Sequence, residues 1–163
     1  MKPIRYVTDE SYREFKGRVP RVIALAMDLS LLTGHDLSAL LELRWQDVKA
    51  IGLLRDKWVV EIGRLRSEKP RSLQIAAPLE QVLKSCKMML PHWPREFVLR
   101  RDDGGGMSVK EFNAIWNLYM RRWAGIDRPA FAFREIRTKA LFDLQVARKA
   151  ARRRTPRRGS IRK

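Results

Sequence analysis

The sequence predicts an α+β fold that is mostly helical and contains a small three-stranded antiparallel sheet. Apolar residues recur at helical spacing in 9–33 and again in 108–151, whereas the spacing between these regions changes to that of β-strands. The chain has 163 residues, enough to bury a core, and 45% of them are hydrophobic, which argues against a disordered chain. We expect one folded module over residues 1–146 and a basic tail over residues 147–163.

The first elements are helices. A helix capped by Thr8 is followed by a second one that begins at Pro20. Nearly every side of the segment 21–33 is apolar, which predicts a buried central helix. Gly34 ends this helix, and Asp36 can cap a short amphipathic helix after it.

The middle region predicts the sheet. Segment 58–62 is rich in β-branched residues and segment 72–76 alternates, so the two are expected to pair across a basic turn at 64–71. Residues 96–100 are expected to add one more short strand. A helix that begins at Pro78 and ends before Pro91 is expected between segments 72–76 and 96–100.

The C-terminal region returns to helical spacing. Ser108 and Glu111 form a capping box, and one face of the helix that follows is aromatic. The segment from Phe133 to about Ala151 predicts an amphipathic basic helix. Nine of the last nineteen residues are Lys or Arg and none is acidic, so this end is expected to be a solvated basic tail.

The charge balance points to a polyanion as partner. The chain contains 35 Lys and Arg against 18 Asp and Glu, a net charge of +17, which favours nucleic acid, an anionic membrane surface or an acidic protein. The most apolar stretch, 22–32, is far shorter than the roughly 20 residues of a membrane span, and we expect no secretory signal at the start. Cys86 is the only cysteine, so we expect no disulfide, no zinc site and a cytoplasmic location.

Two segments resemble a known family. Residues 32–48 read LTGHDLSALLELRWQDV and residues 133–138 read FREIRT. Together with the opening YVTDE at 6–10 and the order of elements, they resemble the catalytic domain of phage integrases, the tyrosine recombinases. The resemblance covers most of the chain up to about Val146. We expect the separate N-terminal DNA-binding domain of that family to be missing, so that the chain is at most half an integrase.

The resemblance implies a phosphoryl-transfer site. Members of the family cleave DNA with a tyrosine that attacks a phosphodiester, while two Arg, a Lys and His or Trp side chains stabilise charge on the phosphoryl oxygens. Arg137 matches the second-box Arg, and Arg134 stands at the His position. The hairpin Lys aligns with Arg66, although Lys69 could reach in from the same turn. Asp36 stands where the family has its first-box Arg, which reverses the charge.

Each of these residues also has a structural explanation. Asp36 can be an ordinary N-cap with His35 as a structural or exposed neighbour. Arg134 and Arg137 can occupy an exposed helix face. The Gly-His pair and the nucleophilic Tyr of the family are not found downstream, and the sequence departs abruptly after Val146, as truncation, frameshift or decay would each produce.

No tyrosine is expected to act as the nucleophile. The tyrosines are Tyr6, Tyr12 and Tyr119, and Tyr119 belongs to the apolar stripe of its helix. We therefore expect a DNA-binding module of integrase type, from a phage or prophage element, that does not cleave DNA by itself. The residues expected to bind double-stranded DNA are Arg64, Arg66, Lys69, Arg71, Arg134, Arg137, Arg148, Arg152 and Arg153.

Two alternatives stay open. The chain could be an active strand-transfer domain whose tyrosine comes from another subunit or from a missing segment. It could instead bind RNA or other polyanions without specificity through its basic tail. We expect no cofactor, no metal and no membrane contact, and a monomer in solution that can form an oligomer on DNA.

Overall fold

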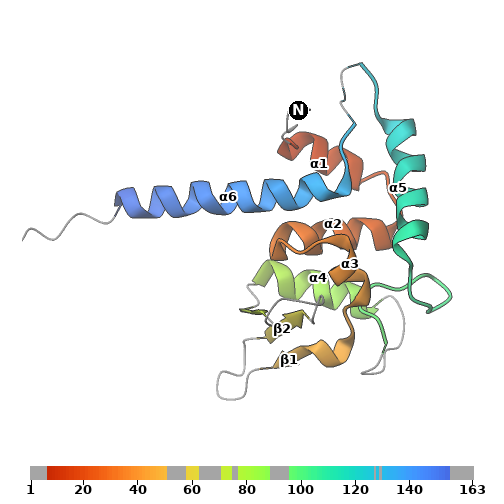
Figure 1. Ribbon diagram of the computed structural model, residues 1–163, viewed down its shortest axis with the longest axis horizontal. Helices are drawn as coiled ribbons and strands as arrows, with labels where there is room; N and C mark the ends of the chain where they lie inside the picture. The colour runs from red at the N-terminus through yellow and green to blue at the C-terminus, as the bar shows by residue number, and fades with distance from the viewer. Residues whose placement is uncertain are drawn as a thin grey trace, which may run out of the picture.

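A computed structural model describes residues 7–50, 58–62, 71–74, 77–88, 96–126, 128 and 130–154 of the chain. Its elements, shown in Figure 1, are α1 (Asp9–Lys16), α2 (Arg21–Thr33), α3 (Leu37–Glu42), η1 (Trp45–Asp47), β1 (Val48–Ala50), β2 (Trp58–Ile62), β3 (Arg71–Gln74), α4 (Ala77–Met88), α5 (Val109–Trp123) and α6 (Phe133–Arg154). The described part is therefore mostly helical, as the sequence predicts.

Helix α2 lies at the centre of the molecule. It packs against α6 on one side and α4 on the other, and it also contacts α1 and α3 (Figure 1). Its buried side chains point in nearly every direction around the helix; they are Val22, Ile23, Leu25, Ala26, Met27, Leu29 and Ser30. The prediction of a buried central helix is confirmed, because a helix that is apolar all round must be covered on all sides.

Local capping explains where several helices begin. The hydroxyl of Thr8 accepts a hydrogen bond from the backbone N–H of Ser11 at 3.1 Å, which starts α1. Ser108 and Glu111 form the reciprocal capping box of α5, with hydrogen bonds of 3.2 Å and 2.8 Å. Both starts are confirmed where the sequence places them, since a cap depends only on side chains within a few residues.

An aromatic cluster joins α1 to α5 and to the segment before α6. The ring of Phe15 is fully buried and lies 4.8 Å from Trp116, centroid to centroid. Trp123 and Phe131 each lie 5.4 Å from the same ring. These edge-on and tilted contacts are the geometry that aromatic pairs prefer. They hold the start of α6 against the body of the protein.

The sheet has the order β1-β2-β3 and is antiparallel throughout. Its register pairs Val48 with Val60 and Val60 with Leu73. The expectation that 96–100 would add a strand to this sheet is wrong. That segment instead makes an isolated bridge between Phe97 and Arg44, and its Val98 is buried in the core.

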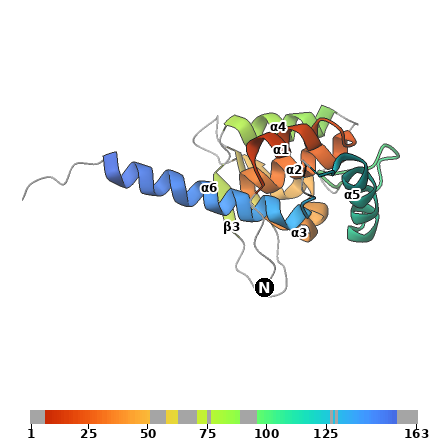
Figure 2. The ribbon, with the colours of Figure 1, turned by 90° about the horizontal axis from the view of Figure 1, so that it is seen from above.

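Helix α6 is the longest element and extends beyond the body of the molecule (Figures 1 and 2). Its first turns pack on α2, and Ile136 is fully buried there. The helix continues through residues 147–154, so the expected boundary between module and tail at 146 lies inside a helix. Within the described ranges, none of the helices combines the length and the apolar character that a membrane crossing requires.

Candidate functional site

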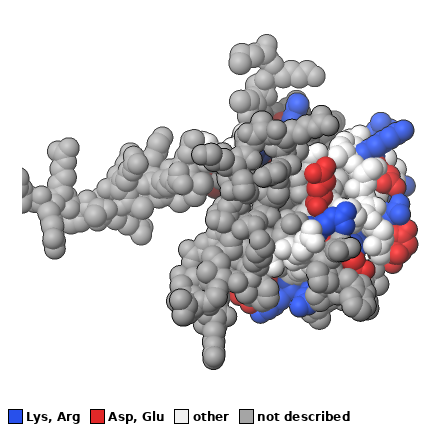
Figure 3. All heavy atoms as spheres, turned by 60° about the horizontal axis from the view of Figure 1, so that its bottom comes forward, with Lys and Arg blue, Asp and Glu red and all other residues white. Residues whose placement is uncertain are grey.

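Charges of both signs lie on the described surface. On the face shown in Figure 3, basic and acidic side chains lie next to one another. Several cations are paired with acids: Arg101 lies 3.0 Å from Asp103 and 2.9 Å from Glu111, and Arg128 lies 3.0 Å from Glu14. Part of the basic charge of the described residues is therefore neutralised by neighbouring acids.

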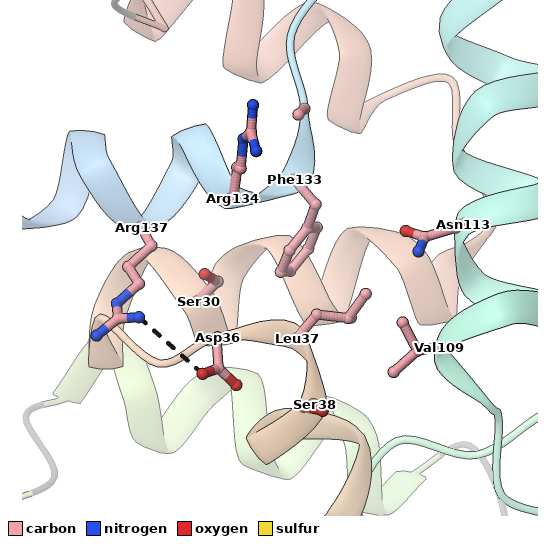
Figure 4. A pocket seen from close by; sticks show the side chains of 10 residues that line it. Ser30, Asp36, Leu37, Ser38, Val109, Asn113, Phe133, Arg134 and Arg137 are labelled. Atoms are coloured by element: carbon pink, nitrogen blue, oxygen red, sulfur yellow. Dashed lines mark ion pairs between the residues drawn. The ribbon is translucent and has the colours of Figure 1, made fainter. Parts of the chain in front are cut away.

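A cavity of about 420 Å³ opens where the first turns of α6, α3 and α5 meet (Figure 4). Its lining residues are Ser30, Asp36, Leu37, Ser38, Val109, Asn113, Ala132, Phe133, Arg134 and Arg137. The fold thus brings together three positions that the sequence analysis selects from two distant segments, namely Asp36, Arg134 and Arg137. Sequence reasoning had no signal for Asn113 or for the serines of the lining.

The turn that carries Asp36 is held from two sides. Gly34 adopts a left-handed conformation with φ 71°, and its N–H donates to the carbonyl of Ser30 at 2.8 Å. The buried hydroxyl of Ser30 donates to the carbonyl of His35 at 3.0 Å. Oδ1 of Asp36 accepts from the N–H of Ala39 at 3.0 Å, so the N-cap interpretation of Asp36 is confirmed.

Arg137 faces this carboxylate across the cavity. Its Nη1 lies 4.0 Å from Oδ2 of Asp36, and the two side chains are 49% and 44% exposed (Figure 4). Both groups are reached by water, so the attraction between them is moderate. The cavity therefore presents the negative charge of Asp36 to the guanidinium of Arg137.

Arg134 points in a different direction. It lies one turn before Arg137 on α6 and lines the same cavity, but its side chain extends away from Asp36 and Arg137 (Figure 4). Within the described part of the chain, Arg134 makes no ion pair. The two arginines occupy the same face of α6, as expected from their spacing. Their side chains, however, extend in opposite directions from that face (Figure 4).

The described tyrosines and the cysteine do not line this cavity. The hydroxyl of Tyr12 donates to Oδ1 of Asp28 at 2.8 Å, and burial together with this negative charge raises the pKa of Tyr12 far above its usual range. Tyr119 packs against the core. Burial also raises the pKa of the Cys86 thiol to about 12. All three side chains are held in structural roles.

His35 also has a structural role. Its ring Nδ1 lies 3.1 Å from the carbonyl oxygen of Thr33, inside the turn before α3. Among the described residues, no group of His, Cys, Asp and Glu has the arrangement needed to hold a metal ion.

The basic hairpin and the distal end of α6 are described only in part. Arg64, Arg66 and Lys69 lie outside the described residues. Arg71 begins β3, and Arg148, Arg152 and Arg153 lie on the distal half of α6, but their side chains are outside the described part. The predicted roles of these cations stay predictions.

Lys139 is a charged residue whose burial the sequence analysis missed. Its side chain is only 3% exposed, and its Nζ lies 2.6 Å from Asp9 and 2.9 Å from Asp143. The hydrogen bond from Lys139 holds the pKa of the Asp9 carboxyl below its usual value. The i,i+4 spacing from Lys139 to Asp143 was visible in the sequence. The contact with Asp9, which ties α6 to the start of α1, was not.

Comparisons of the sequence find no protein-family model and no curated protein that matches this chain. Solved structures do match. A lambda integrase dimer bound to a COC' core site aligns with a TM-score of 0.62 and 17% identity, over 95% of this chain and 58% of that one. The lambda integrase catalytic core aligns with a TM-score of 0.61 and 19% identity, over 93% of this chain and 94% of that one.

A third match comes from a transposon. The Tn1549 integrase, in complex with circular intermediate DNA, aligns with a TM-score of 0.68 and 14% identity, over 90% of this chain and 54% of that one. This chain therefore spans about half the length of the longer integrases and nearly all of the isolated catalytic core. At these identities the comparison establishes the fold. The chain has the fold of a tyrosine-recombinase catalytic domain.

Proposed function

We propose that this chain is a DNA-binding module of integrase type that holds duplex DNA mainly through its phosphates. The observation that carries the proposal is the cavity where α6 meets the turn before α3, with Arg134 and Arg137 in its lining. Guanidinium groups suit phosphate because they offer several N–H donors in a planar fork. The solved structures with this fold include a complex with a core site and one with circular intermediate DNA, which supports DNA as the ligand.

The same cavity argues against cleavage by this chain alone. A cleaving site needs an oxygen nucleophile and fixed cations where negative charge develops. Within the described residues, the cavity receives no tyrosine, and Asp36 supplies an anion where a cation would be needed. Loss of one transition-state donor typically costs roughly 10²–10³ in rate. Phosphate contacts carry little sequence information, so the proposed module binds duplexes of many sequences.

The proposal includes five further expectations. The folded module spans residues 1–146 and the basic tail residues 147–163. The protein comes from a phage or prophage element and works in the cytoplasm without a cofactor. It is a monomer in solution, which light scattering on the purified chain would measure.

The test is a salt titration of affinity for a generic duplex of 30 base pairs. The slope of log K against log salt is about −0.9 for each phosphate that the protein neutralises. We expect Arg134→Gln with Arg137→Gln to weaken binding and to flatten this slope by the equivalent of up to two phosphates. The matched control is Arg121→Gln with Arg122→Gln on α5, which removes two exposed cations that do not line the cavity and should flatten the slope less.

Three outcomes would contradict the proposal. If Arg148→Gln, Arg152→Gln and Arg153→Gln together abolish binding while the cavity variant binds normally, the tail is a polyanion binder. Equal affinity for double-stranded and single-stranded DNA would also argue against the cavity as a site that binds duplex DNA. A covalent protein–DNA adduct trapped on a nicked duplex would show instead that the chain is an active strand-transfer domain.

A further inference from the structure

We propose that Asp36 is an internal competitor for Arg137 that lowers the affinity of the cavity for DNA phosphate. This inference rests on the proposed function and concerns the regulation of the same site. Its basis is the ion pair between Oδ2 of Asp36 and Nη1 of Arg137, at 4.0 Å across the cavity (Figure 4).

Asp36 is the fixed partner of this pair. Its Oδ1 is engaged by the N–H of Ala39, and its backbone is held between the left-handed Gly34 and the hydrogen bond from Ser30 to His35. These contacts leave Oδ2 facing the cavity. The carboxylate therefore remains at the cavity wall whether or not a ligand is present.

Arg137 is the mobile partner. Its side chain is long, 49% exposed and pairs with a carboxylate that is 44% exposed. Exposed pairs of this kind are weak, so a phosphate with good hydrogen-bond geometry can take the guanidinium from the carboxylate. Binding of phosphate then opens the pair, and the loss of the attraction between Arg137 and Asp36 lowers the affinity of the cavity for phosphate without closing it.

The test is Asp36→Asn in the full chain. Asparagine caps a helix about as well as aspartate, so the hydrogen bond to Ala39 is retained while the charge is removed. We expect the affinity for a 30-base-pair duplex to rise about fivefold, the upper range for an exposed pair. The salt slope should stay nearly unchanged, because Arg137 engages a phosphate in both proteins and only the competition from Asp36 is removed.

Arg137 must be responsible for this gain. The double variant Asp36→Asn with Arg137→Gln should therefore bind the duplex no more tightly than the single variant Arg137→Gln. The control Asp102→Asn makes the same change in net charge at an exposed position that does not line the cavity, and its effect should be smaller. If Asp36 were only a helix cap, Asp36→Asn would leave DNA affinity unchanged. An unchanged affinity, or a gain that survives without Arg137, overturns the inference.

A second measurement separates the two proposals. Inorganic phosphate is titrated into the full chain while the side-chain Nε–Hε resonance of Arg137 is followed by NMR. Asp36→Asn should bind phosphate several-fold more tightly than the wild type, with the largest shift at Arg137. If no variant binds duplex DNA, the proposed function fails and this titration still decides the competition. If DNA binding depends on the cavity but Asp36→Asn changes neither the affinity for duplex DNA nor that for phosphate, the proposed function stands and the competition by Asp36 is refuted.

Discussion

Gly34 and Gly17 end consecutive helices in different backbone conformations, and replacing each with alanine should have opposite effects. Gly34 has φ 71°, in the left-handed region, whereas Gly17 has φ −69° and ψ −8°. A left-handed residue with a Cβ costs about 1–2 kcal/mol, while the lower entropy of the unfolded chain returns about 0.4–1 kcal/mol. We expect Gly34→Ala to lower the free energy of unfolding by about 1 kcal/mol.

The space around each glycine does not change this expectation. A Cβ on Gly34 would lie 3.8 Å from Cδ2 of Leu141, an ordinary contact, so its cost is torsional. A Cβ on Gly17 would lie 3.6 Å from the carbonyl oxygens of Arg13 and Glu14, which is also tolerated. Gly17→Ala should therefore raise the free energy of unfolding by about 0.4–1 kcal/mol.

The assay is urea unfolding of the full chain, followed by tryptophan fluorescence. The two variants should differ by about 1–2 kcal/mol, which corresponds to several degrees in Tm for a chain of this size. The m-values should stay equal, because neither change alters the surface exposed on unfolding. The reasoning would be refuted if Gly34→Ala were as stable as the wild type, or if both variants were destabilised by the same amount.

Two further predictions concern the core and its buried cation. Phe15→Ala removes the ring that contacts Trp116, and it should destabilise the protein by about 3–5 kcal/mol in the same assay; a decrease of under about 1 kcal/mol would contradict this packing. Lys139→Met should lower stability near pH 7. That deficit should shrink as the pH falls through the lowered pKa of Asp9, because protonation removes the pairing in the wild type. A deficit that stays constant from pH 7 down to a pH at which Asp9 is protonated would argue against the ion pair.

The helices could be predicted from the sequence because their signals are local. Thr8 and Ser108 cap α1 and α5 through hydrogen bonds that span three residues, and Gly34 ends α2 through its own backbone conformation. The apolar pattern of 21–33 similarly required a helix covered on all sides. The N-cap role of Asp36 could be predicted for the same reason, because its hydrogen-bond partner, Ala39, is only three residues away.

Contacts between distant segments could not be predicted in this way. Segment 96–100 carries a strand-like pattern, but its Phe97 bridges to Arg44, and the third strand of the sheet is instead Val48–Ala50. The burial of Lys139 depends on Asp9 at the other end of the described chain. No local rule brings these residues together, since each pair exists only after the helices have packed.

The candidate site was likewise predictable from the sequence only in part. The sequence by itself determined which residues carry its charges, including the carboxylate of Asp36 and the guanidinium of Arg137. Only the tertiary structure decided that these two face each other at 4.0 Å while Arg134 points away. The reason is physical: residue type determines the charge, but the packing of α6 on α2 and the turn after Gly34 determine the distance over which that charge acts.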